Sequence, residues 1–257
     1  MSVWFVIPSA RPPEEAEKCL AKWLAQGYKV AIQRDIDAQT SPAGWMRGSG
    51  GYPDWEGIYA AATFPVEFRP YSGYAESVNF LVKQIMEYDS SAMWFVTGGD
   101  DTDPDPNHTA DEIAQECLDH FQKGTFGVMQ PTGDRYAFDR ALGSCAIDRV
   151  AGSPWMGREW CARINQGRGP LWSEYTHMFV DEELQAVAIK YGVFWQRPDL
   201  IHLHHHYMRQ SDALDSKAIH RDAPAHLVEV NSTDHWQKYK KIFEARKAAG
   251  FPGSEPL

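Results

Sequence analysis

The carboxylates of this chain are most concentrated directly after a short apolar run. Residues 93–97 read MWFVT, and two glycines separate this run from four aspartates, Asp100, Asp101, Asp103 and Asp105. An apolar run of this length predicts a buried strand that delivers the acids to one edge of a sheet. Carboxylates packed so closely repel one another, so a divalent cation or strong solvation must compensate them. The pattern indicates either a metal site that holds an anionic ligand or a solvated acidic turn.

A second acidic group follows much later in the chain. Asp181, Glu182 and Glu183 begin an apolar pattern that predicts a helix over residues 181–191. A carboxylate beside an acceptor hydroxyl can remove its proton as a general base. The alternative is a structural role, in which Asp181 caps the helix and the two glutamates favour its dipole. The two roles are compatible with each other.

Four histidines lie within five residues, at His202, His204, His205 and His206. The surrounding residues 200–207 predict a strand, and its period of two places His205 on one face and the other three on the opposite face. Imidazole is a ligand for Mn²⁺ and Zn²⁺, so His204 and His206 are candidates for a metal site. The alternative is a set of exposed or stacked histidines that bind no metal.

Two segments rich in aromatic and turn residues are candidate substrate walls. Residues 152–160 read GSPWMGREW and contain Trp155 and Arg158, and residues 169–175 read GPLWSEY and contain Glu174. The indole of Trp155 offers a flat apolar face that suits a sugar ring, and the guanidinium of Arg158 suits a phosphate. The alternative for the tryptophans is ordinary packing in the core.

The order of the predicted elements indicates a fold of the α/β class. Residues 3–8 predict a buried strand, a helix opens at Pro12-Pro13, and residues 29–33 predict a second strand. Open α/β sheets bind ligands beyond the carboxyl ends of such strands. Thr109 is the expected N-cap of the helix that follows the acids. Further strands are predicted at 93–97, 125–129, 193–196 and 200–207, and further helices at 73–88, 109–122, 157–165, 181–191 and 234–249.

This order and its motifs resemble a glycosyltransferase of the GT-A fold, close to the large inverting family 2 type, over residues 3–207. In that family the first strand ends in a Pro-Ser or Pro-Thr turn, as Pro8-Ser9 does here. The second strand ends in an acid that contacts the nucleobase, here Asp35. A helix with an Ala/Gly-x-x-x-Asn pattern, which ends here at Asn79, precedes the strand that carries the DxD-like motif. The resemblance implies that these residues bind the donor nucleotide.

The resemblance also assigns roles to the acids. Gly99-Asp100-Asp101 occupies the position of the DxD motif, with glycine where the first aspartate is usual. It implies Asp101 as the metal ligand, Asp100 near the ribose or a bound water, and Asp103 as a second ligand. Asp181 stands at the position of the general base in a Glu-Asp-x-Glu-Leu type motif whose first acid is a valine here.

A cofactor, substrates and a domain order follow from the same resemblance. It implies Mn²⁺ or Mg²⁺, bound with help from a late histidine, and a hexosyltransferase-like reaction with a nucleotide-sugar donor, a UDP-sugar being favoured. The hydroxyl acceptor is a glycan, a lipid-linked sugar, a protein or a hydroxylated nucleobase of DNA, the last as in phage-encoded enzymes. We expect one catalytic domain, a Rossmann-type open mixed sheet flanked by helices, over residues 1–207. Its nucleotide-sugar half spans 1–106, its acceptor half spans 107–207, and a C-terminal helical extension spans 208–257.

Three other classes of function fit parts of the pattern. A sugar-nucleotide pyrophosphorylase would share a similar sheet, but it needs a glycine-rich loop around triphosphate that is absent after Ile7. A metal-dependent hydrolase would use Asp101 and the histidines to activate water, and would release phosphate or sugar without an acceptor. A non-catalytic carbohydrate-binding protein would bind its ligand equally well after Asp181→Asn.

The composition indicates the class of protein, the partners it favours and the compartment in which we expect it. The chain has 257 residues, of which 43% are hydrophobic and 23% charged, as in soluble globular proteins. Its formal net charge of −10, from 25 basic and 35 acidic residues, argues against binding nucleic acid by bulk electrostatics. No apolar run approaches 18 residues, so we expect no membrane insertion. Four scattered cysteines without a CxxC pair indicate reduced thiols and a cytoplasmic protein, in the host cytoplasm if a phage encodes it.

Overall fold

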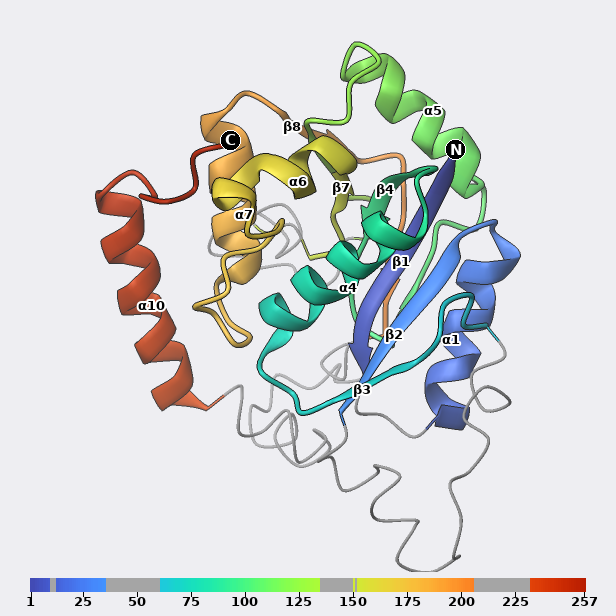
Figure 1. The fold of residues 1–257 in the computed structure, drawn as a ribbon, viewed down its shortest axis with the longest axis horizontal. Coiled ribbons are helices and arrows are strands. Elements are labelled where there is room, and N and C mark those ends of the chain that lie inside the picture. The colour runs from blue at the N-terminus through green and yellow to red at the C-terminus, as the bar shows by residue number, and fades with distance from the viewer. Residues whose placement is uncertain (10–12, 36–60, 135–149, 151, 206–231) are drawn as a thin grey trace, which may run out of the picture.

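The computed structural model describes residues 1–9, 13–35, 61–134, 150, 152–205 and 232–257. Within them, a mixed sheet of seven strands runs in the order β3-β2-β1-β4-β7-β6-β8 (Figure 1). Strand β7 is antiparallel to β4 and β6, whereas the other neighbours are parallel. The prediction of an α/β protein with a mixed sheet flanked by helices is confirmed. The strands are β1 (Ser2–Ser9), β2 (Lys29–Asp35), β3 (Glu67–Arg69), β4 (Ala92–Val96), β6 (Val128–Pro131), β7 (Trp155–Gly157) and β8 (Phe194–Arg197).

Helices cover both faces of the sheet, which explains why β1 is apolar along most of its length. Its alternate side chains enter two different hydrophobic clusters, with Val3 and Phe5 in one and Trp4 and Val6 in the other. Helices α1 (Pro13–Ala25) and α5 (Ala110–His120) pack on the first face. Helices α4 (Tyr74–Tyr88), α6 (Arg158–Gly167) and α7 (Val180–Lys190) pack on the second face (Figure 1).

Most predicted elements are present, and one is much shorter than expected. Thr109 caps α5 as predicted, in a capping box with Glu112. The strand predicted over residues 200–207 is reduced, in its described part, to β9 (Leu203–His204), because its partner β5 (Thr102–Asp103) is itself only two residues long. The two strands pair antiparallel, with Thr102 opposite His204. This two-stranded ribbon places the segment around Asp101 and Asp103 next to His204 and His205.

Asp89 ties together the edge of the sheet where β1 and β2 begin. Its carboxylate accepts hydrogen bonds from Ser2 Oγ at 2.7 Å, Trp4 Nε1 at 3.0 Å and Lys29 Nζ at 2.8 Å. Ser91, at the start of β4, donates to it from both its backbone N–H and its hydroxyl. Burial alone would raise the pKa of Asp89, but these donors hold it well below the usual 3.8.

The C-terminal helix α10 (Thr233–Ala248) packs beside α7 (Figure 1). Its Tyr239 is buried, and the Tyr239 hydroxyl is hydrogen-bonded to Thr176 Oγ1 at 2.6 Å. The predicted boundary between residues 207 and 208 lies outside the described residues. None of the helices in the described part of the chain is long and apolar enough to cross a membrane.

Candidate functional site

The acidic turn that contains Asp100 and Asp101 begins where β4 ends. Hydrogen bonds with three other parts of the chain fix its first residues. Thr97 Oγ1 donates to the carbonyl oxygen of Val6 in β1 at 2.8 Å. The hydroxyl of Tyr74, at the start of α4, is hydrogen-bonded to Thr97 Oγ1 at 2.7 Å and to the carbonyl oxygen of Gly98 at 3.3 Å. Ser153 Oγ donates to the carbonyl oxygen of Thr97 at 3.0 Å. The chain therefore leaves the sheet in a defined direction.

The end of β1 contacts this turn, as expected for two neighbouring parallel strands that end at one edge of a sheet. Ser9 Oγ donates to Asp100 Oδ2 at 2.6 Å, so two of the predicted donor-binding residues meet directly. Pro8 precedes Ser9 in β1, opposite Gln33 of β2. Arg34, fully buried, donates to the carbonyl oxygen of Ser9 at 3.4 Å.

Sequence reasoning assigned no role to Arg34, although a basic residue near the carboxyl end of β2, where open α/β sheets bind ligands, is a usable signal. It places a guanidinium at the same edge of the sheet as Asp100, where an anionic ligand would need a positive charge. Asp35, the predicted nucleobase contact, is the last residue of β2, opposite Arg69 of β3. Its side chain is outside the described part of the structure.

The ribbon of β5 and β9 brings together two of the predicted metal ligands. His204 Nε2 lies 3.2 Å from Asp101 Oδ1, and the backbone N–H of His205 donates to the carbonyl oxygen of Asp101 at 2.8 Å. Two ligands of an octahedral Mg²⁺ or Mn²⁺, each roughly 2.1 Å from the ion, stand about 3 Å apart, so this pair fits such an ion. His206, the other predicted histidine ligand, lies outside the described residues.

The carboxylate of Asp103 has different partners from that of Asp101. Its carboxylate accepts hydrogen bonds from Cys19 Sγ at 3.0 Å and Lys22 Nζ at 2.5 Å, and it is 2.7 Å from His205 Nε2. Burial alone would raise the pKa of Asp103, but these three partners lower it. The prediction of Asp103 as a second metal ligand therefore needs correction: its oxygens already bind Cys19, Lys22 and His205, and Asp103 belongs to no group of three or more potential ligands among the described residues.

Two buried residues fix the ribbon against the sheet. Asp105 is fully buried, and it accepts hydrogen bonds from the backbone N–H groups of Asn107, His108 and Ile201. The His202 ring is hydrogen-bonded to Ser153 Oγ at 2.8 Å, and burial lowers its pKa to about 3. His202 therefore stays neutral at physiological pH and acts as a support beneath the acidic turn.

Asp181 lies in the first turn of α7, close to the same turn. The N-cap of this helix is Phe179 and no side chain caps it, so the predicted capping role of Asp181 is not observed. Burial first, and the charge of Glu182 second, raise the pKa of Asp181 to about 8. Burial and the charge of Asp181 in turn raise the pKa of Tyr74. The Tyr74 hydroxyl is also hydrogen-bonded to the carbonyl oxygen of Gly98. The same side chain therefore interacts with the acidic turn and with the charge of Asp181.

Two predicted site residues have structural roles instead. The side-chain amide of Asn79 donates to the carbonyl oxygen of Leu171 at 2.7 Å and accepts from its N–H at 3.0 Å. This leaves Asn79 to anchor the 169–171 segment on α4, and not to contact a nucleotide. Trp155 is completely buried in β7, so its indole belongs to the core and offers no face to a sugar.

The other two predicted substrate contacts differ in accessibility. Arg158 donates to the backbone carbonyl oxygens of Met86, Asp89 and Ala92, at distances of 2.9 to 3.2 Å. These bonds satisfy the carboxyl end of α4, so Arg158 is a structural residue and not a phosphate ligand. Glu174 is exposed and accepts a hydrogen bond from Trp172 Nε1 at 3.2 Å. It stays a candidate for an acceptor contact.

The described part of the chain provides few side-chain ligands for a cation. Among them, no group of three or more His, Cys, Asp or Glu side chains is placed to hold a metal ion. The Asp101 and His204 pair would therefore need a substrate or water for the remaining ligands, as is common for Mg²⁺. A small hollow of about 10 Å³ between α6 and α7 is lined by Trp172 and Glu183, but by neither Asp101 nor Asp181.

Comparison with known proteins adds no family to this picture. No model of a protein family matches the chain. No curated protein matches it significantly.

Proposed function

We propose that the protein is a metal-dependent inverting glycosyltransferase of the GT-A-like Rossmann type. It would move a sugar from a nucleoside diphosphate to a hydroxyl acceptor. The observation that carries this proposal is a set of contacts at one edge of the sheet, Asp100 with Ser9 and Asp101 with His204. The charge of Asp181 acts on Tyr74, whose hydroxyl is hydrogen-bonded to Gly98 of the same turn. Ligands of open α/β sheets bind at this edge.

The donor half of the site consists of Ser9, Asp100, Asp101, His204 and Arg34. Ser9 and Asp100 would orient the nucleoside, and the buried guanidinium of Arg34 would favour a negatively charged diphosphate nearby. Asp101 and His204 would hold Mn²⁺ or Mg²⁺. When bound, the cation would offset the charge that develops on the leaving diphosphate.

The acceptor half depends on Asp181. An acceptor hydroxyl is a poor nucleophile until it loses its proton, and an ionised Asp181 would accept that proton during an in-line displacement. A base with a pKa of about 8 keeps a strong affinity for protons near neutral pH. A displacement on the face opposite the leaving diphosphate inverts the anomeric carbon. The exposed Glu174 would contact the acceptor, which we propose to be a glycan or a hydroxylated nucleobase of phage DNA.

A thermal-shift panel of nucleotide sugars, with and without Mn²⁺, tests the donor half. A ligand at 100 times its Kd adds about 2.7 kcal/mol of stability, which raises the Tm of a chain of this size by roughly 5–10 °C. We expect this shift with a UDP-sugar and Mn²⁺, and its loss in Asp101→Ala. The control Asp111→Ala removes an exposed carboxylate from α5 and should keep the shift.

Product analysis separates this proposal from the alternatives. Transfer requires an acceptor and produces a β-linked product from an α-linked donor, whereas a hydrolase releases sugar or phosphate from the donor alone. A carbohydrate-binding protein would turn over no donor and would bind equally well after Asp181→Asn. Absence of any nucleotide-dependent shift would rule out the transferase.

A further inference from the structure

Glu183, two residues after Asp181 on α7, is a buried carboxylate that the C-terminal helix holds. It is 2% exposed. Arg246 of α10 donates to it from Nε and Nη2, with distances to the two carboxylate oxygens between 2.6 and 3.1 Å. The Tyr175 hydroxyl donates to Glu183 Oε2 at 2.7 Å. Such a forked contact fixes both the position and the orientation of a carboxylate.

The first turn of α7 needs this support because its own cap is weak. Phe179, the N-cap residue, has a positive φ of 68°, which residues with a side chain rarely adopt. No side chain caps the free N–H groups of this turn, which are the groups that let helix ends fray. The Phe179 ring instead packs against two rings of α10, Trp236 at 5.8 Å and Phe243 at 5.4 Å between centroids.

A second set of hydrogen bonds connects α10 to Tyr74 of α4, the residue on which the charge of Asp181 acts. Tyr239 of α10 is hydrogen-bonded to Thr176 Oγ1 at 2.6 Å, and the carbonyl oxygen of Thr176 accepts from the N–H of Tyr74 at 2.7 Å. The Tyr74 hydroxyl is hydrogen-bonded to Gly98 in the acidic turn, and the charge of Asp181 raises its pKa. Helix α10 therefore contacts both sides of the Asp181 environment.

We propose that Arg246 is a positioning residue for Asp181, and that α10 is part of the acceptor half of the site. By binding Glu183, Arg246 fixes the first turn of α7 and keeps the Asp181 carboxyl in its half-buried position, where its charge acts on Tyr74. This inference rests on the proposed function for the role of Asp181 as the base. The described titratable groups that interact electrostatically with Asp181 are Tyr74 of α4 and Glu182 on α7 itself.

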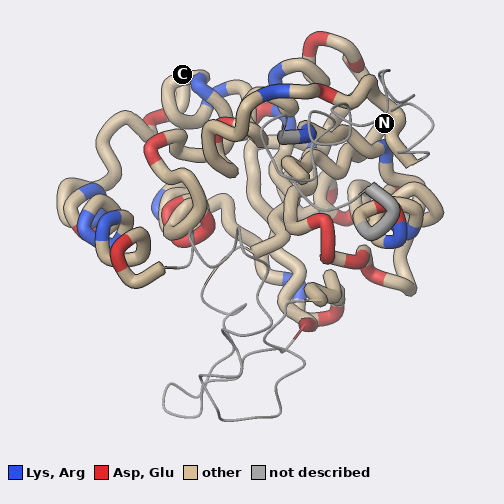
Figure 2. Tube along the Cα trace, turned by 90° about the horizontal axis from the view of Figure 1, so that it is seen from below, with Lys and Arg blue, Asp and Glu red and all other residues tan. Residues whose placement is uncertain are grey.

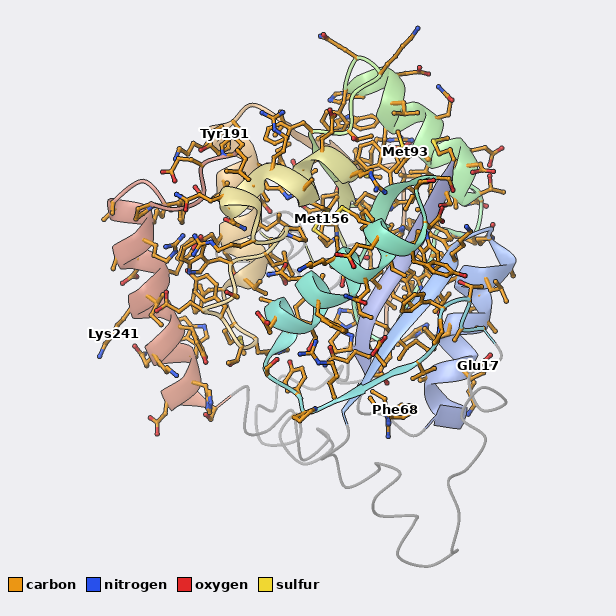
Figure 3. All side chains as sticks on the ribbon, in the orientation of Figure 1. Glu17, Phe68, Met93, Met156, Tyr191 and Lys241 are labelled. Atoms are coloured by element: carbon orange, nitrogen blue, oxygen red, sulfur yellow. The ribbon has the colours of Figure 1, made fainter. Side chains whose placement is uncertain are left out.

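Helix α10 also provides a matched control. It carries five basic residues (Figure 2), and the Arg246 side chain is 11% exposed in its pair with Glu183. Lys241 lies on the same helix but is exposed and points away from the rest of the molecule (Figure 3). Arg246→Gln and Lys241→Gln each remove one positive charge from α10. Only the first removes the contact with Glu183.

The test is an NMR titration of ¹³C-labelled aspartate in the full chain, with the Asp181 signal assigned by its loss in Asp181→Asn. We expect a midpoint near 8 in the wild type and in Lys241→Gln. In Arg246→Gln the midpoint should fall by at least one pH unit toward 3.8, because a loosened first turn admits water. Arg246→Lys keeps the charge but lacks the planar fork, so its midpoint should lie between the two.

An unchanged midpoint in folded Arg246→Gln would overturn the proposal. If that variant does not fold, Glu183→Gln replaces it, since its amide keeps the volume and one acceptor, and the same fall is expected. The titration needs no turnover, so a wild type without transferase activity would refute the proposed function and leave this test intact. In an active enzyme, Arg246→Gln should lower kcat at least tenfold with an unchanged KM for the donor, whereas Lys241→Gln should leave both unchanged.

Discussion

Replacing Asp181 with asparagine should stabilise the protein at alkaline pH. An aspartate in an unfolded chain ionises near its usual pKa of 3.8, whereas burial and Glu182 raise the pKa of folded Asp181 to about 8. The folded state therefore disfavours the ionised carboxylate. Asparagine has nearly the same shape and never ionises, so it avoids this cost. A residue that destabilises its own protein in the charged form is typical of a functional site.

Proton linkage gives the sign and the size of the effect. Below pH 3.8 the carboxyl is protonated in both states, so the substitution changes little. Between pH 3.8 and 8 only the unfolded state ionises, and wild-type stability falls by at most about 1.4 kcal/mol per pH unit. The full interval would amount to about 6 kcal/mol, but the Asp181 side chain is partly exposed and solvent reduces the cost. We expect Asp181→Asn to be about 2–3 kcal/mol more stable at pH 9.

Urea unfolding, followed by tryptophan fluorescence at pH 5, 7 and 9, measures this difference. The stabilisation should be small at pH 5 and grow toward pH 9, while the variant loses glycosyl transfer because an amide accepts no proton. Asp111→Asn, in the exposed first turn of α5, is the control for removal of a first-turn carboxylate. Equal stability of Asp181→Asn and the wild type at pH 9, or a difference that does not change with pH, would refute the reasoning.

Two further predictions concern the scaffold. Asp89→Ala leaves the buried indole N–H of Trp4 without an acceptor and should cost about 3 kcal/mol at pH 7. Because the pKa of Asp89 lies below 3.8, urea unfolding should show this difference unchanged from pH 7 to pH 4 and smaller in stronger acid. Gly157→Ala would place a methyl group against the carbonyl oxygen of Thr125, so we expect a loss of about 2–3 kcal/mol and a lower Tm by calorimetry.

The sequence allowed the acidic turn to be predicted because it depends on a local pattern, whereas its histidine partner followed from the resemblance to GT-A glycosyltransferases. An apolar run followed by glycines and acids identified β4 and its end, and β4 does end at Val96. The contact between Asp101 and His204 also agrees with the predicted pair of ligands, although metal binding itself stays a prediction. The contacts of Asp103 were not predictable, because they depend on Lys22, a residue of α1 about 80 positions earlier.

Two residues of the candidate substrate walls, Trp155 and Arg158, were mispredicted for a similar reason. Strand β7 has only three residues, too few to show the alternation that distinguishes a central strand from a loop. Its Trp155 therefore had the same local pattern as an exposed tryptophan. Arg158 binds carbonyl oxygens at the end of α4, and backbone carbonyls leave no mark in a sequence. Only the fold determines which of these side chains reach solvent.

The two acids at the start of α7 show how environment divides similar residues into different roles. Asp181 and Glu183 are two positions apart, and only the resemblance to family 2 enzymes distinguishes them in the sequence. Glu183 receives donors from Arg246 and Tyr175, which make it an anchor for the helix. No such donor reaches Asp181 from the described part of the chain, and a half-buried carboxyl without donors retains its proton to a higher pH than a solvated one. The Glu183 anchor therefore supplies the rigidity that keeps the neighbouring Asp181 in its half-buried, basic position.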